Sequence, residues 1–161
     1  MQRVEVIEGN RVDLRAACEL WFLADEGPAT DDNQRRAVVQ SLAAEMSTLW
    51  DRPPVHLFLA TAASQLVGSI FGKPRRDDPQ TGQISLLAVH PAWQRQGVGQ
   101  LLLDAALNAL AHDGCQRCRA YVVASDATLQ RFYEKRGWTF TGEVDASPHD
   151  SVQERVFLKP L

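Results

Sequence analysis

The stretch that decides the fold runs from residue 87 to residue 102 and reads LAVHPAWQRQGVGQLL. An apolar segment ends at Val89, and the following His-Pro pair favours a break because proline keeps the residue before it extended. Two glycines, Gly97 and Gly99, then precede a run of apolar residues at helical spacing. The pattern predicts a buried strand, a tight turn and a helix in direct succession.

The predicted turn is a candidate site for an anion. Backbone N–H groups in the first turn of a helix have no partner within the helix, and the helix dipole adds about half a positive charge there. Glycines allow a phosphate to approach that backbone without a clash with a Cβ atom. The donors we expect are Arg95 and the amides of Gln96 to Gln100. A helix that merely begins with two glycines is the alternative interpretation.

Neither common nucleotide motif fits this turn. A dinucleotide fingerprint needs a third glycine where Leu102 stands, and no phosphate-loop string ending in Gly-Lys-Ser or Gly-Lys-Thr occurs.

Upstream of the turn, the sequence predicts a strand, two helices and then three further strands. The second helix is expected to begin at a capping residue, Asp31 or Asp32. A hairpin turn is expected at Ser64-Gln65. The predicted elements are a strand over residues 4–8, helices over 12–25 and 31–50, and strands over 55–61, 65–73 and 83–89. The apolar stripe of the second helix comprises Val38, Leu42, Met46, Leu49 and Trp50.

Downstream, helices and strands alternate before a final hairpin. The predicted elements are helices over 97–112 and 126–136 and strands over 119–124, 138–144 and 153–158. Alternation implies a parallel crossover, whereas hairpins imply antiparallel pairs. We therefore predict an α/β (α+β) fold, with a mixed, mostly antiparallel sheet of six to seven strands and helices on both faces. The charged run Arg75 to Asp78 is interpreted as a solvated hairpin tip.

Composition narrows the class of protein. The 161 residues are 45% hydrophobic and 23% charged, which is typical of one globular domain over residues 1–161. The net charge of −3 argues against a nucleic-acid partner. No apolar run reaches the roughly 20 residues that span a membrane. Three cysteines do not make a disulfide framework, so we expect a cytoplasmic protein with reduced thiols and no metal site.

Two motifs resemble those of the GNAT family of N-acetyltransferases. Residues 94–99, QRQGVG, fit the family's pyrophosphate motif, and residues 132–138, FYEKRGW, fit its second motif near the end of a later helix. The order of predicted elements also resembles the family's order over nearly the whole chain. Asp126 stands where the family often has Asn, and Leu129 where it often has Ala.

The resemblance implies a GNAT-like acyl-CoA N-acyltransferase fold and direct transfer of an acetyl group from acetyl-CoA to an amine. The strand ending at Val89 would splay from residues 121–123, leaving room for the pantetheine arm. The implied cofactor-binding residues are Leu87, Ala88, Val89, Gln94, Arg95, Gln96, Gly97, Val98, Gly99, Gln100, Asp126, Leu129, Phe132 and Tyr133.

Two of these residues are the implied catalytic groups. The amide of Leu87 would stabilise the developing oxyanion, and Tyr133 would protonate the departing thiolate. On the acceptor side the resemblance points to Trp21 and Glu26. The resemblance implies that the acceptor would be a small-molecule or peptide amine, and a homodimer is compatible with the family. The alternatives are a non-catalytic acyl-CoA-binding module on the same fold and an unrelated nucleotide-binding domain.

Overall fold

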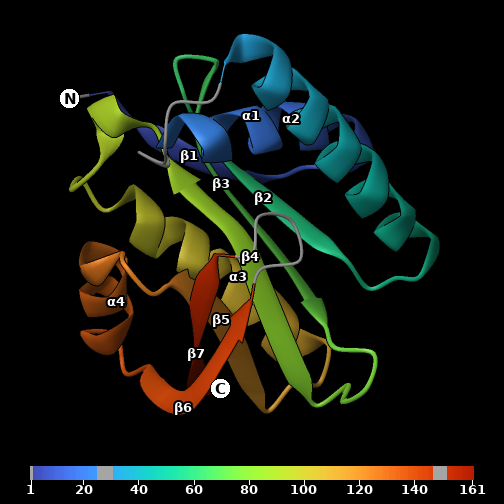
Figure 1. Cartoon of the computed structure of the whole chain (residues 1–161), viewed down its shortest axis with the longest axis vertical. Helices are drawn as coiled ribbons and strands as arrows, with labels where there is room; N and C mark the ends of the chain where they lie inside the picture. The colour runs from blue at the N-terminus through green and yellow to red at the C-terminus, as the bar shows by residue number, and fades with distance from the viewer. Residues whose placement is uncertain (1, 25–30, 147–151) are drawn as a thin grey trace.

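A seven-stranded sheet with helices on both sides forms the described part of the chain (Figure 1). The computed structural model describes residues 2–24, 31–146 and 152–161. The elements are β1 (Val4–Glu8), α1 (Leu14–Ala24), α2 (Asp32–Ser47), β2 (His56–Ala62), β3 (Gln65–Pro74), β4 (Thr81–Val89), α3 (Val98–His112), β5 (Arg117–Val123), α4 (Ala127–Glu134), β6 (Thr139–Ala146) and β7 (Gln153–Pro160).

The strands are arranged in the order β1-β2-β3-β4-β5-β7-β6. Only β4 and β5 pair in parallel, and α3 forms the crossover between them; the other neighbouring strands of the described sheet pair antiparallel. A parallel pair needs such a crossover because the chain has to run back to the end of the sheet at which the first strand of the pair began. The fold class predicted from the sequence is confirmed.

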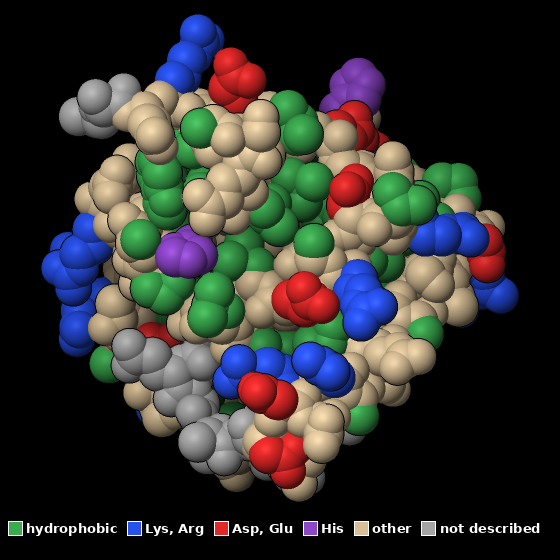
Figure 2. Space-filling model, turned by 90° about the horizontal axis from the view of Figure 1, so that it is seen from above, with side chains coloured by type: hydrophobic (Ala, Val, Ile, Leu, Met, Phe, Trp, Pro, Cys, Tyr) green, Lys and Arg blue, Asp and Glu red, His purple; other side chains and the backbone are tan. Residues whose placement is uncertain are grey.

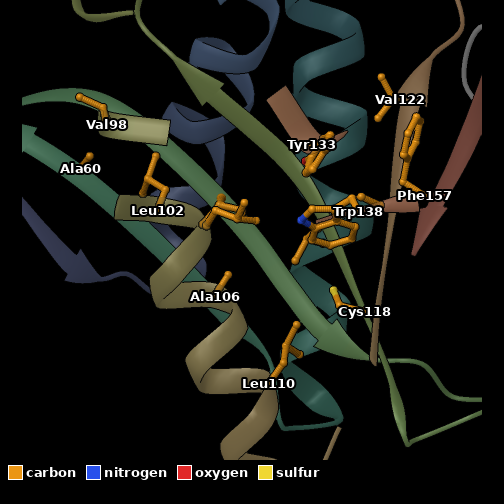
Figure 3. Close-up of a cluster of buried hydrophobic side chains, with 14 of the residues drawn as sticks. Ala60, Val98, Leu102, Ala106, Leu110, Cys118, Val122, Tyr133, Trp138 and Phe157 are labelled. Carbon is orange, nitrogen blue, oxygen red and sulfur yellow. The ribbon is translucent and has the colours of Figure 1, made fainter. Parts of the chain in front are cut away.

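Each face of the sheet has its own hydrophobic cluster. The cluster under α3 and α4 includes Val98, Leu102, Ala106 and Leu110, which follow one side of α3 at helical spacing (Figure 3). The cluster under α1 and α2 includes Leu14, Cys18, Val39, Leu42 and Met46. Burial of these two apolar stripes against the sheet is the main force that holds the layers together.

Two details of the predicted elements are wrong by one residue. Asp31, one of the two expected caps, does cap α2, but the buried stripe of this helix begins at Val39, which is 3% exposed, whereas Val38 is 42% exposed. One residue turns a helix by about 100°, and adjacent valines gave no means of choosing between them. The β2–β3 turn lies at Ala63 and Ser64, both with positive φ, as a two-residue hairpin turn requires.

Three further general features concern the described helices, the cysteines and the surface charges. None of the described helices combines the length and the hydrophobicity needed to cross a membrane. All three cysteines are buried and free. On the face that Figure 2 shows, acidic and basic side chains are interspersed with hydrophobic ones, so that this surface carries charges of both signs.

Candidate active site at the opening between β4 and β5

The parallel pairing of β4 and β5 stops halfway along β4. The paired residues run from Thr81 opposite Arg117 to Ile84 opposite Ala120. Beyond this point β5 stays paired with β7 as far as Val123, and β4 stays paired with β3 as far as Val89. Within the described sheet, residues 85–89 therefore have no partner on the β5 side. The splay that the family resemblance implied, at residues 87–89 against residues 121–123, lies within this opening, which begins two residues earlier on β4.

A β-bulge at Leu86 accompanies the opening. The β3–β4 register shifts by one residue between the pairs Ser69–Ala88 and Phe71–Ser85, and Leu86 has a φ of +54°. Leu86 packs into the cluster under α1 and α2, whereas Leu87 packs against the cluster under α3 and α4. Bulges bend a strand and interrupt its ladder. Sequence reasoning missed this feature, because a leucine carries no signal for a left-handed backbone.

The turn between β4 and α3 contains two residues with a left-handed backbone. Arg95 and Gly97 both have left-handed φ values, of 62° and 84°. Left-handed residues in tight loops bring successive N–H groups to one side, which is the geometry of anion-binding nests. Gly97 is the N-cap of α3 and no side chain caps the helix there, so the first-turn amides keep their capacity to donate.

Side-chain contacts hold this turn in place. The Gln94 side chain donates to the Val89 carbonyl over 3.0 Å, and the Gln96 side chain donates to the Ala92 carbonyl over 3.2 Å. A Cβ atom at Gly97 would meet nothing within 4 Å, so the space beside this backbone is open. Residues 94–97 are exposed, which leaves the turn accessible to a ligand.

Tyr133 is buried in an aromatic cluster on the same side of the sheet. It is 3% exposed, and its ring lies 5.0 Å from that of Trp138 and 6.3 Å from that of Phe157 (Figure 3). Burial raises the pKa of the Tyr133 hydroxyl, with a smaller contribution from Cys118. Leu87 and Tyr133, the two residues expected to be catalytic, thus belong to one hydrophobic cluster.

Helix α4 and its N-cap position three further predicted cofactor residues, Asp126, Leu129 and Phe132. Leu129 and Phe132 pack against the same cluster as Val89, and the Phe132 ring lies 3.4 Å from the position of a Cβ on Gly99. The carboxylate of Asp126 accepts from the Leu129 amide over 2.9 Å, which makes Asp126 the N-cap of α4.

Sequence reasoning missed Arg136, which joins the two motifs. Its guanidinium stacks on Phe132 at 3.7 Å from the ring centroid and donates to the Gln100 side chain and, over 2.8 Å, to the Phe132 carbonyl. A positive side chain therefore lies beside the first turn of α3. The only signal in the sequence was its place inside the second motif, at a position where the motif accepts any residue.

The predicted acceptor residues lie partly outside the described residues. Trp21 on α1 is half-buried against the cluster under α1 and α2, with its ring 5.0 Å from that of Phe22. Glu26 falls within residues 25–30, outside the described residues. Trp21 is therefore on the opposite face of the sheet from Tyr133, and the opening between β4 and β5 lies between these two layers.

Comparison with known proteins assigns the family. Residues 16–138 match the family model described as the acetyltransferase (GNAT) family. The chain belongs to the GNAT acetyltransferase family. The donor expected from the sequence, acetyl-CoA, is the one that this family uses.

Individual relatives of this GNAT chain agree with the family. A mycothiol acetyltransferase from Beutenbergia cavernae is 39% identical over 62 residues, which are 38% of this chain and 21% of that protein. A mycothiol acetyltransferase from Propionibacterium freudenreichii is 26% identical over 129 residues, which are 77% of this chain and 39% of that protein. The chain spans between 21% and 39% of the length of the curated relatives that it matches.

Solved structures show the same fold. A GNAT acetyltransferase from Staphylococcus aureus superposes with a TM-score of 0.78 at 16% identity, over 99% of both chains. The PaiA N-acetyltransferase from Thermoplasma acidophilum, solved in complex with coenzyme A, gives a TM-score of 0.73 at 19% identity, also over 99% of both chains. At these low identities, the similarity to the two solved structures shows a shared fold and no more.

Proposed function

We propose that this chain transfers an acetyl group from acetyl-CoA to the primary amine of a small molecule, by direct transfer in a ternary complex. The observation that carries the proposal is the opening of β4 from β5 after Ile84 and Ala120, with an accessible anion-binding turn following β4 and a buried tyrosine in the adjoining cluster.

The residues around the opening fit the donor. The amides of residues 95–100 form a cradle with open space at Gly97, which suits a diphosphate. Arg136 adds a positive charge beside this turn. The edge of β4 beyond Ile84 faces β5 without a strand partner among the described residues, and its free N–H and C=O groups suit an amide-containing arm.

Two groups of the chain would take part in the chemistry. When bound, acetyl-CoA supplies the acetyl group as a thioester and coenzyme A leaves as a thiol. The Leu87 amide would donate to the carbonyl oxygen as negative charge develops on it; such a donor is worth about 3–4 kcal/mol. Tyr133 would hold a proton at its Oη atom and give it to the departing sulfur, while the proton that the amine loses on forming the amide passes to solvent, from which Tyr133 is reprotonated. Its raised pKa keeps the Oη proton in place to a higher pH than in a free tyrosine.

A small-molecule acceptor is favoured by the relatives. The curated relatives are mycothiol acetyltransferases, although they match only over part of their length. Trp21 would form part of the acceptor wall on the α1 face. A peptide amine is the competing acceptor, and the experiment below separates the two.

The test is a panel of amines scored by release of free thiol from acetyl-CoA. Amino sugars, amino acids, polyamines and short peptides are each offered with acetyl-CoA, and products are identified by mass spectrometry. We expect one class of small amines to give acetylated product at a rate that saturates with acceptor. If coenzyme A binds and no amine is acetylated, the non-catalytic acyl-CoA-binding module replaces this proposal.

A further inference from the structure

A groove with basic walls lies between the end of the second helical segment and the β3–β4 hairpin. Its cavity has a volume of about 300 Å³. One wall is formed by Leu49 and Arg52, at the end of a short helix over Thr48–Asp51, with the two following prolines. The other wall is formed by residues 73–76 and Pro79. Two segments far apart in the sequence thus meet at this groove.

All the charged side chains that line the groove are positive. They are Arg52, Lys73, Arg75 and Arg76. Arg75 is paired with Asp77 over 3.0 Å, but within residues 2–24, 31–146 and 152–161 no ion pair is formed by Arg52, Lys73 or Arg76. This concentration of positive charge stands out in a chain whose net charge is −3.

The charges in the groove influence one another. The pKa of the half-buried Lys73 is lowered, first by burial and then by the charges of Arg76 and Arg75, while Asp77 acts in the opposite direction. Like charges held together at a partly desolvated site produce a positive potential that an anion would relieve.

The sequence predicted a solvated tip for the β3–β4 hairpin, but one of its charged side chains, Arg75, is largely buried. The Arg75 side chain is only 19% exposed and donates to the Tyr121 hydroxyl over 3.1 Å and to the Gln83 side chain over 3.3 Å. These bonds fix the guanidinium between β4 and β5. The walls also hold prolines at positions 53, 54, 74 and 79, whose φ angles are fixed by their rings.

We propose that this groove binds a phosphate group of a small-molecule ligand, at a site separate from the donor and acceptor sites. Guanidinium groups present forked donors that match phosphate oxygens, and a multiply charged anion is matched to several cations better than a carboxylate is. Such a ligand would bridge the segment after α2 and the β3–β4 hairpin.

A neighbouring cavity, with a volume of about 260 Å³, differs from the groove in how its arginines are paired. It also contains Arg75, but each of its arginines is already paired with an acid. The pairs are Arg75–Asp77, Arg117–Asp78 and Arg119–Glu143. An incoming anion would have to displace these carboxylates. In the groove, Arg75 has such a partner, but Arg52, Lys73 and Arg76 form no ion pair among the described residues.

The lysines provide a local test, because the chain has only three: Lys73, Lys135 and Lys159. NMR of lysine side chains labelled with ¹³C and ¹⁵N is recorded while inorganic phosphate or pyrophosphate is added to protein holding one equivalent of coenzyme A. We expect the Lys73 signals to move in a saturable way and the Lys73 pKa to rise towards its ordinary value. The other two lysines serve as internal references.

Paired double variants complete the test. Arg52→Ser with Arg76→Ser should weaken phosphate binding by about tenfold or more, whereas Arg35→Ser with Arg36→Ser, on the exposed side of α2, should leave it unchanged. Acetyl transfer should be the same in both. The proposal is overturned if Lys73 does not respond to phosphate, if acetate binds equally well, if both double variants bind alike, or if only an oligonucleotide binds.

Discussion

Ile84 and Ala120 are the last paired residues of β4 and β5, and both are almost completely buried, at 1% and 0% exposure, in the cluster under α3 and α4. The opening between the strands thus starts from a fixed point in the core. Close packing makes such a core resist deformation. A donor bound in the opening would therefore lie next to a close-packed part of the core.

Replacement of Tyr133 by phenylalanine tests the proposed acid. Tyr133→Phe keeps the ring against Trp138 and Phe157 but removes the proton that the leaving sulfur would take. We expect kcat to fall by about 10²–10⁴-fold, with the Kd for coenzyme A unchanged. Steady-state kinetics and calorimetry measure the two quantities.

Tyr121 is the matched control, because it is the other tyrosine of the chain. Tyr121→Phe removes a hydroxyl that accepts from Arg75 and should change kcat by less than about threefold. Equal losses in both variants, or an unchanged kcat in Tyr133→Phe, would rule out the acid role.

The left-handed backbone at Gly97 gives a second prediction. The open space beside Gly97 would accept a side chain, but its φ of +84° would not suit a β-branched residue. We expect Gly97→Val to distort the turn and to weaken coenzyme A binding by about tenfold, which corresponds to the 1–2 kcal/mol of a left-handed residue.

Asparagine tolerates the left-handed region better than valine. Gly97→Asn should therefore retain more affinity for coenzyme A than Gly97→Val does, and calorimetry of both variants measures the difference. If the two variants bind equally tightly, backbone conformation at Gly97 does not control the site.

The strand, turn and helix around Gly97 were predictable because local patterns determine them. Apolar periodicity and the positions of glycine and proline depend on neighbouring residues, and the α4 cap at Asp126 was predictable in the same way. Two motifs added the resemblance to the family, and with it the expected splay between residues 87–89 and residues 121–123. The roles of the individual site residues stay predictions.

Other features depend on contacts that the sequence pattern does not contain. The bulge at Leu86 arises from pairing with β3, and the choice of Val39 over Val38 arises from how α2 packs. The position of Arg136 beside Gln100 depends on the packing of α4 against α3. Likewise, Arg52 and Arg76 are 24 positions apart, and the fold alone brings them to one groove.

The raised pKa of Tyr133 predicts the alkaline side of the pH–rate profile. Burial favours the neutral phenol, so the acid stays protonated to a higher pH than the value near 10 of a free tyrosine. With a primary amine acceptor, kcat/KM should rise with pH as the amine loses its proton. We expect no decline in kcat/KM at any pH up to about 10. A decline that begins near pH 8 and is absent in Tyr133→Phe would contradict this expectation.

The buried thiol of Cys18 predicts how stability changes at high pH. Burial, followed by the charge of Glu19, raises the Cys18 pKa from 9.0 to about 11. Below pH 9 the thiol is protonated in both folded and unfolded chains, so its contribution to stability is complete. Between these two pKa values unfolding releases a proton, and the free energy of unfolding falls by at most about 1.4 kcal/mol per pH unit for this group.

Removal of the Cys18 thiol isolates that contribution. In Cys18→Ala the free energy of unfolding should decline less steeply from pH 9 to pH 11 than in the unmodified chain, because the variant has one fewer buried group to ionise. Urea unfolding at several pH values measures both slopes. Cys118→Ala is a useful companion, since burial also raises the Cys118 pKa and its loss should flatten the same region. If the free energy of unfolding falls equally steeply with pH in the Cys18 variant and in the unmodified chain, the Cys18 thiol is exposed to solvent. Such a result would contradict the burial of this thiol by the packing of α1.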